Sequence, residues 1–179
     1  MKEKALRRLA EKLNAAGVTW AMGAGWLLCR LGVTEDYHDL DLFVAEADAA
    51  RADAALAGLG MASAPDTSDG FRRSYHFDGA DIDLTSGMTV RREDGIYRIP
   101  FGPEDVAGAA QVLGAQVPLM YPEDWLVIYG LIGRESRVRA LEAWLRARGP
   151  EHPERFRRVC PGPLPDSLEQ VISSLIGGK

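Results

Sequence analysis

The sequence has almost no cysteine and no long apolar run. Cys29 and Cys160 are its only cysteines, they lie far apart, and no CxxC pair or zinc-ligand spacing occurs. We therefore expect no disulfide framework. We expect a reducing, cytoplasmic compartment instead. No stretch approaches the roughly 18 consecutive apolar residues of a membrane span. The charged start of the chain also lacks the apolar centre of a signal peptide, so we expect a soluble protein with no membrane partner.

The sequence also lacks an excess of positive charge. Its 179 residues include 21 Lys and Arg against 26 Asp and Glu, which gives a formal net charge of −5. This balance argues against nucleic-acid binding through a general basic surface, although a local basic patch stays open. With 46% hydrophobic and 26% charged residues, the chain is typical of a globular protein that can bury a core.

Local patterns predict alternating helices and strands in the first part of the chain. Leu6, Leu9 and Leu13 share one face of a helix predicted over residues 3–16. The further predicted elements are a strand over 18–22, a glycine turn at 23–25, a helix over 26–32, a strand over 38–45 and an alanine-rich helix over 45–61. Residues 71–87 predict two strands joined at Asp78–Gly79, and 96–100 predict another.

The pattern changes to helices near residue 115. Pro122 suits the first position of a helix, with Glu123 and Asp124 in its first turn. A second helix follows within 121–145, and a last one is expected over 167–178. The prediction is an α+β chain with an α/β half, 1–115, and a helical half, 116–179.

Two Asp-x-Asp pairs in strand-like settings are the main chemical signal. Asp39 and Asp41 lie in HDLDLF, and Asp81 and Asp83 lie in ADIDLT. Aspartate is depleted in strands, and residues i and i+2 point from the same face. Each pair therefore indicates either a solvated strand face or a face whose carboxylates bind a cation. Two such strands in one sheet would gather hard oxygen ligands of the kind that Mg²⁺ prefers.

The turn GAG, Gly23 to Gly25, precedes the helix predicted over 26–32. Backbone N–H groups of such a turn can bind a phosphate, although glycine turns before helices are common. Several arginines could complement phosphates or simply be solvated; they are Arg72, Arg73, Arg134, Arg137 and Arg139. The helical spacing of Trp125, Tyr129 and Trp144 is typical of core packing. The ERFRR run at 154–158 is typical of a solvated face.

Taken together, MGAGWLLCRLGVTEDYHDLDLFV (22–44) resembles the signature of the nucleotidyltransferase superfamily related to DNA polymerase beta. The similarity is to the aminoglycoside and lincosamide nucleotidyltransferase-like proteins and the minimal nucleotidyltransferases. In these, a glycine turn opens a helix, a D-x-D strand follows about a dozen residues later, and a third carboxylate lies on a later strand. YPEDWLVIYGLIGRESRVRALEAWL (121–145) resembles the helical region of the same proteins.

The resemblance implies a small mixed sheet flanked by helices, with a C-terminal helical unit closing over a cleft. It implies Mg²⁺-dependent transfer of a nucleoside monophosphate from an NTP to a hydroxyl. Asp39, Asp41 and Asp83 would be catalytic and would bind two Mg²⁺ ions, with Asp81 as the alternative third acid. Gly23, Ala24, Gly25 and Arg134 would bind the nucleotide.

The chain departs from this pattern at several places, two of which bear on phosphate binding. Ala24 stands inside the glycine turn, and a lysine common in such proteins corresponds to Tyr129 or Gly130. These departures keep open a catalytically inactive binding protein, for instance a toxin–antitoxin component, and a plain structural α/β domain is a third interpretation. The acceptor could be an aminoglycoside-like small molecule, which predicts an acidic cleft in the helical half, or RNA or protein, which predicts a basic or apolar shelf.

Overall fold

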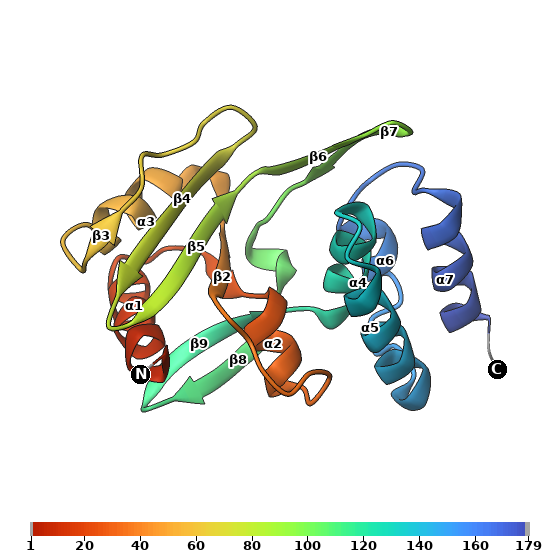
Figure 1. The fold of residues 1–179 in the computed structure, drawn as a ribbon, viewed down its shortest axis with the longest axis horizontal. Coiled ribbons are helices and arrows are strands. Elements are labelled where there is room, and N and C mark those ends of the chain that lie inside the picture. Colours follow the sequence, from red (N-terminus) through yellow and green to blue (C-terminus); the bar gives the residue numbers. More distant parts are fainter. Residues whose placement is uncertain (1, 178–179) are drawn as a thin grey trace.

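The computed structural model describes residues 2–177 and has a sheet at one end and helices at the other (Figure 1). The elements, in chain order, are α1 (Lys2–Ala15), β1 (Trp20–Met22), α2 (Ala24–Arg30), β2 (Leu40–Val44), the 3₁₀ turn η1 (Glu46–Asp48), α3 (Ala49–Leu56), β3 (Met61–Ala62), β4 (Phe71–Phe77), β5 (Ala80–Ser86), β6 (Met88–Arg92), β7 (Gly95–Ile99), the 3₁₀ turn η2 (Pro103–Asp105), β8 (Val106–Val112), β9 (Ala115–Met120), α4 (Pro122–Leu131), α5 (Glu135–Arg148), α6 (Arg155–Arg158) and α7 (Asp166–Ile176). The predicted α+β class is confirmed.

Seven strands form a mixed sheet in the order β3-β4-β5-β2-β1-β9-β8. Strands β2 and β5 are parallel neighbours, as are β1 and β9, whereas the other neighbouring pairs are antiparallel. The predicted hairpin turn between β4 and β5 is present, and Asp78 and Gly79 both have positive φ, at 52° and 71°. Because β2 and β5 pair in parallel, two strands far apart in sequence lie side by side at the centre of the sheet.

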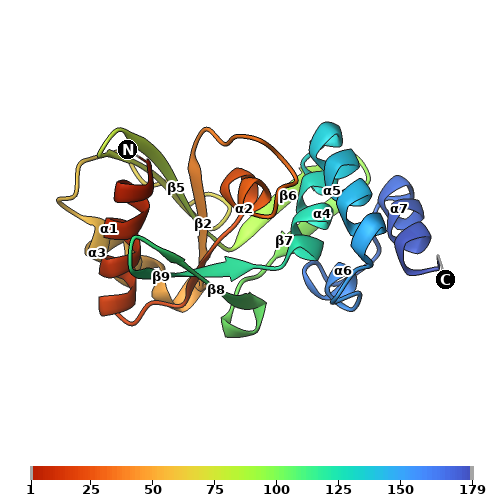
Figure 2. The ribbon, with the colours of Figure 1, turned by 90° about the horizontal axis from the view of Figure 1, so that it is seen from below.

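The two faces of β2 meet different surroundings. Leu40, Leu42 and Val44 point into a core with α1 and α3, where Leu6 and Leu9 are fully buried as their spacing predicted. Figure 2 shows α1 and α3 on one side of β2 and α2 on the other. Successive strand side chains alternate between faces, so the aspartates of HDLDLF occupy the side away from α1 and α3.

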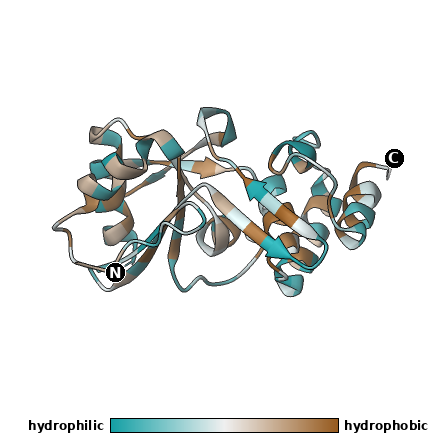
Figure 3. Cartoon of the chain, turned by 90° about the horizontal axis from the view of Figure 1, so that it is seen from above, coloured by the Kyte–Doolittle hydropathy of each residue, from teal (hydrophilic) through white to brown (hydrophobic). Residues whose placement is uncertain are grey.

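The helical region packs around α4. This helix is buried on nearly every side, including Glu123 and Asp124. The hairpin of β6 and β7 extends from the sheet toward these helices, and Val90, Tyr97 and Ile99 join their core. In Figure 3, viewed from above, the two strands of the hairpin lie in front of the C-terminal helices and carry both hydrophobic and hydrophilic residues. The hairpin thereby connects the sheet to the helical region.

Three local expectations need correction. The helix predicted over 45–61 ends at Leu56, and the chain then turns at Gly58, whose φ of +81° is outside the helical region. The helical spacing of Ile132 with Trp125, Ile128 and Tyr129 predicts a place in the apolar stripe of α4, but Ile132 is 37% exposed. The ERFRR run is not simply solvated, because Arg155 is 2% exposed and bonds to Asp124 and Asp105.

The predicted division at residue 115 stays a prediction, but β9 continues the sheet to Met120, so the first helix of the C-terminal region begins at Pro122. Within residues 2–177, no helix is both long and apolar enough to cross a membrane.

Candidate functional site

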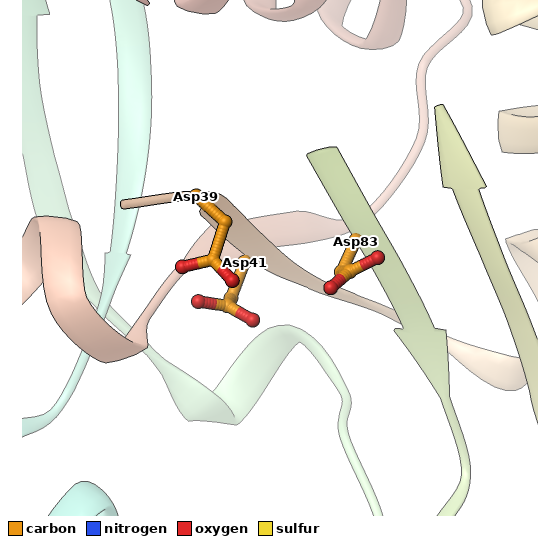
Figure 4. Close-up of side chains that lie close together, drawn as sticks. All are labelled: Asp39, Asp41 and Asp83. Carbon is orange, nitrogen blue, oxygen red and sulfur yellow. The ribbon is translucent and has the colours of Figure 1, made fainter. Parts of the chain in front are cut away.

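Three carboxylates meet where β2 and β5 run side by side. Asp41 in β2 lies opposite Asp83 in β5 in the parallel register, and Asp39 precedes β2 by one residue. One oxygen from each side chain lies within 4.8 Å of the other two. Figure 4 shows the three carboxylates turned to the same side of the two strands. We call these three residues the acid cluster.

Asp81 lies on the same face of β5 but outside the acid cluster. It is opposite His76 of β4, and its Oδ1 is 2.7 Å from His76 Nδ1. Asp83 instead accepts a hydrogen bond of 2.5 Å from the hydroxyl of Ser74. Of the two acids between which the sequence could not decide, Asp83 is therefore the one that the fold places beside Asp39 and Asp41.

The electrostatics of the acid cluster are unbalanced. Burial, and then the negative charges of Asp39 and Asp83, raise the pKa of Asp41 to about 7, and Arg72 lowers it only in part. Carboxylates this close resist simultaneous ionisation unless positive charge lies among them. Three carboxylate groups on a rigid sheet are suitable ligands for Mg²⁺, so the residues fit the ion that the resemblance implies.

The acid cluster forms one wall of a cleft of ≈ 570 Å³ between the sheet and the helical region. The sheet side contributes the three acids, Phe43, Thr85 and Arg72, and the hairpin contributes Met88. The turn before α2 and the loop before β2 contribute Ala24, Gly25 and His38, and α4, α5 and the link between them contribute Trp125, Ile128, Tyr129, Ile132, Arg134, Ser136 and Arg137. A volume of this size is typical of a small-molecule or nucleotide site.

The arginines of the cleft differ from most others in the chain. Among residues 2–177, Arg72, Arg134 and Arg137 have no carboxylate within salt-bridge distance and no side-chain hydrogen bond. Such carboxylate partners are present for Arg7, Arg8, Arg51, Arg73, Arg91, Arg92, Arg98, Arg139, Arg146, Arg155, Arg157 and Arg158. Three guanidinium groups therefore remain available to an anion that enters the cleft.

The other two arginines considered from the sequence do not join this group. Arg73 points to the opposite face of β4 and donates to both carboxylate oxygens of Asp53 at 2.8 Å. Arg139 lies 3.5 Å from Glu135 one turn earlier in α5 and is absent from the cleft lining. The period-2 alternation of β4 explains why Arg72 faces the acids and its neighbour does not.

The glycine turn lies against the acid strand. The Gly23 N–H donates to the Asp41 carbonyl oxygen at 3.0 Å, and Ala24 and Gly25 line the cleft. A Cβ on Gly23 would lie 2.3 Å from the Trp125 ring, so only glycine fits there. Ala24 adopts φ +45°, in the left-handed region that favours glycine, so the departure noted in the sequence is accommodated with strain.

Trp125 and Tyr129 of α4 pack as core residues and also face the cleft. Their ring centres are 5.1 Å apart. Trp125 is 4% exposed and Tyr129 is 6% exposed. The Trp125 Nε1 is buried without a hydrogen-bond partner. Burial raises the pKa of Tyr129 strongly, and the nearby charge of Asp41 raises it further. Trp144 lies elsewhere, and its Nε1 donates to the Leu31 carbonyl oxygen.

Some residues of the cleft carry no motif of their own in the sequence. Phe43 and Thr85 follow Asp41 and Asp83 by two positions, so strand alternation was a signal that could have found them. Met88 and Ser136 come from the hairpin and from α5, and no local pattern marks them.

Comparisons with known proteins give a match in structure alone. No protein-family model matches the sequence, and a search of curated proteins finds no match. Among solved structures, TM1012 from Thermotoga maritima, classed as a nucleotidyltransferase, is similar with a TM-score of 0.62 and 19% identity, over 80% of this chain and 92% of that one.

An antibiotic-resistance factor and an antibiotic adenylyltransferase are also similar in structure. The antibiotic-resistance factor ANT(2″)-Ia matches with a TM-score of 0.61 and 14% identity over 99% of this chain and 92% of its own. The lincosamide antibiotic adenylyltransferase LnuA, solved with lincomycin bound, matches with a TM-score of 0.54 and 15% identity over 78% of this chain and 95% of its own. The chain therefore has the fold of nucleotidyltransferases, as its resemblance to that superfamily implied.

Proposed function

We propose that this protein is a Mg²⁺-dependent nucleotidyltransferase that moves a nucleoside monophosphate from an NTP to a hydroxyl-bearing acceptor. The observation that carries the proposal is that a cluster of acids and a set of arginines line the same cleft. Asp39, Asp41 and Asp83 lie within 4.8 Å of one another, and arginines without carboxylate partners line the same cleft. Such a site suits a metal-bound triphosphate, whose negative charge needs both cations and guanidinium groups.

In this proposal, the acids and the arginines of the cleft have different roles. Asp39, Asp41 and Asp83 hold two Mg²⁺ ions, which when bound polarise the phosphoryl group and lower the pKa of an attacking hydroxyl. Asp83 also assists removal of the acceptor proton. Arg72, Arg134 and Arg137 balance the charge of the triphosphate.

The glycine turn has a narrower role than the sequence suggested. The Gly23 N–H already donates to the Asp41 carbonyl. The N–H groups of Ala24 and Gly25, which line the cleft, are therefore the proposed phosphate donors of the turn, and Gly23 gives Trp125 room to pack.

The transfer is a displacement at the α-phosphorus. The acceptor oxygen forms a bond to that phosphorus while the bond from the α-phosphorus to the bridging oxygen breaks. Pyrophosphate leaves with the electron pair, and the acceptor proton passes to Asp83 or to solvent. The chain's own contribution is to align the acceptor hydroxyl, the phosphorus and the leaving oxygen, and to stabilise the charge that develops.

Two acceptor classes remain within the proposal. The fold similarity to antibiotic adenylyltransferases supports a small hydroxylated molecule. The helical side of the cleft is basic and apolar, with Arg134, Arg137, Ile128 and Ile132, and this lining supports RNA or protein instead. A labelled-NTP screen that includes aminoglycosides, lincosamides, RNA and the protein itself decides between them.

The first test is a calorimetric titration of each NTP with and without Mg²⁺. Wild type is expected to bind at least one NTP only when Mg²⁺ is present, and Asp39→Asn/Asp41→Asn is expected to lose that binding. Asp81→Asn is the matched control, because this exposed acid lies on the same face of the sheet but pairs with His76. Retained binding in the double variant would remove the acid cluster from the site.

A catalytically inactive binding protein is the second candidate. The specific observation in its favour is Tyr129, an uncharged side chain that lines the cleft and is one of the two residues, with Gly130, that correspond to the lysine of the resemblance. This candidate predicts that a folded wild-type protein binds no Mg²⁺–NTP in the same titration.

A further inference from the structure

Two tyrosines in this chain are almost equally buried but differ in what their hydroxyl groups contact. Tyr75 is 4% exposed and Tyr129 is 6% exposed. The Tyr75 hydroxyl donates to a carboxylate oxygen of Asp53. The Tyr129 hydroxyl has no hydrogen-bond partner among residues 2–177. The Tyr129 hydroxyl is not among the fully buried polar atoms that lack a partner, so it is open to the cleft that its side chain lines and can bind a ligand there.

The position of Tyr129 indicates what that partner would be. Its side chain lines the cleft that holds both the acid cluster and the arginines without carboxylate partners. After burial, the charges that act on its pKa come from both sides of the cleft: Asp41 and Asp39 raise it, whereas Arg137 and Arg134 lower it. Tyr129 therefore shares one cleft with acids suited to a cation and with arginines suited to an anion.

The protonation state of Tyr129 limits its role to donation. Because burial and the acids raise its pKa far above neutrality, the phenol keeps its proton at physiological pH. A donor next to arginines and acids fits an oxygen that carries negative charge and is shared between metal and guanidinium groups. Phosphate oxygens of a metal-bound nucleotide have this character, whereas an acceptor hydroxyl is neutral until it reacts.

We propose that the Tyr129 hydroxyl binds the substrate directly, by donating a hydrogen bond to a phosphate oxygen of the NTP in the cleft. This inference rests on the proposed function, because it requires that the cleft binds an NTP. It assigns Tyr129 as a triphosphate-binding residue, in addition to its packing against Trp125.

The test compares the same substitution at the two tyrosines. Tyr129→Phe removes one oxygen that has no partner within the described chain, so the melting temperature without ligand is expected to stay within about 1 °C of wild type or to rise. Tyr75→Phe removes the hydrogen bond to Asp53 and is expected to lower the melting temperature by about 2–5 °C. Differential scanning calorimetry of both variants and wild type gives these values.

The binding measurement should give the opposite order. Calorimetric titration with Mg²⁺ and the NTP that wild type binds most tightly is expected to show about 10-fold weaker binding by Tyr129→Phe, and no change by Tyr75→Phe. Inorganic tripolyphosphate with Mg²⁺, which has neither base nor sugar, should show the same 10-fold factor. If Tyr129→Phe bound the NTP more weakly but bound tripolyphosphate as wild type does, the hydroxyl would contact the base or the sugar, and the proposal would be overturned.

The remaining outcomes separate this inference from the proposed function. If wild type binds no Mg²⁺–NTP, both are overturned. If wild type and Tyr129→Phe bind Mg²⁺–NTP equally, only the role of Tyr129 is overturned. A large fall in the melting temperature of Tyr129→Phe without ligand would show that the hydroxyl has a structural partner, and this too would overturn the proposal.

Discussion

The chain brings carboxylates together in a buried cluster and in a half-buried cluster, and it neutralises their charge differently. In the helical region, Asp124 is fully buried and Asp105 is 8% exposed, and Arg155 lies between them with contacts of 2.5 to 2.9 Å. In the acid cluster, three carboxylates lie within 4.8 Å of one another, and among residues 2–177 no arginine is within salt-bridge distance of them. Both arrangements desolvate negative charge, but only the first supplies its own cation.

This difference separates a structural cluster from a site for a ligand. Arg155 also donates to the Glu104 carbonyl oxygen and lies 4.5 Å from the Tyr121 ring centre, so it joins η2 to α4 and α6. Its charge is fully used within the protein. The acid cluster instead opens on a cleft, where burial raises the pKa of Asp41 and the charges of Asp39 and Asp83 raise it further. We infer that the cation of the second cluster comes from outside the chain.

The largest effect is expected from removing the cation of the structural cluster. Arg155→Met leaves two buried carboxylates without their partner, which should lower the free energy of unfolding by about 3–5 kcal/mol. Urea denaturation measures this change. Arg158→Met, at an exposed arginine 3.6 Å from Glu104, is the control and should change it by less than about 0.5 kcal/mol. A loss below about 1 kcal/mol for Arg155→Met would mean that the two clusters do not differ in this way.

The next effect is a pH dependence that belongs to Asp41. Its folded pKa is raised from 3.8 to about 7, so the folded protein without metal binds a proton more tightly than the unfolded chain does. The stability contributed by that proton is present below about pH 4 and is lost as the pH rises toward 7. Relative to Asp41→Asn, metal-free wild type should therefore lose on the order of 2 kcal/mol over this range.

Urea denaturation in EDTA at several pH values measures how the free energy of unfolding changes with pH, and Asp81→Asn serves as the control. Added Mg²⁺ should stabilise wild type at pH 7 and above, where Asp41 is ionised, and should have little effect on Asp41→Asn. If the free energy of unfolding of wild type and of Asp41→Asn changed equally with pH, the raised pKa of Asp41 would be contradicted.

A smaller effect is expected at the turn beside the acid cluster. Ala24 has φ +45°, and glycine adopts that conformation without the clash of a Cβ. Ala24→Gly should raise the free energy of unfolding by about 0.5–1 kcal/mol, because relief of strain exceeds the added flexibility of the unfolded chain. Thermal unfolding measures it, with Ala54→Gly in α3 as a control that should be destabilising. Destabilisation by Ala24→Gly would show that the turn is not strained.

The smallest effect on stability is expected at an arginine of the cleft. Arg137 has no carboxylate partner among the described residues, so Arg137→Met should change the free energy of unfolding by less than about 0.5 kcal/mol. The same variant should bind Mg²⁺–NTP at least about 10-fold more weakly, since it loses a guanidinium–phosphate contact. If Arg137→Met lost stability but bound Mg²⁺–NTP as wild type does, Arg137 would be a structural residue like Arg155.

The sequence by itself determined the local geometry of the acids. The alternation of HDLDLF separates the leucines of β2 from Asp39 and Asp41, and the chemistry of two Asp-x-Asp pairs indicated a cation site. The hairpin at Asp78–Gly79 and the leucine face of α1 were also predictable, because each depends on residues within one or two turns of the chain.

Only the tertiary structure decided which distant residues meet. The parallel register of β2 and β5 places Asp83 rather than Asp81 opposite Asp41, and the packing of α4 and α5 brings Tyr129 and Arg137 to the cleft. The burial of Arg155, within a run that is typical of solvent-exposed chain, likewise depends on Asp105 and Asp124, 50 and 31 residues away. Sequence periods fix the direction of a side chain within its own element, whereas register and packing between elements depend on the whole core.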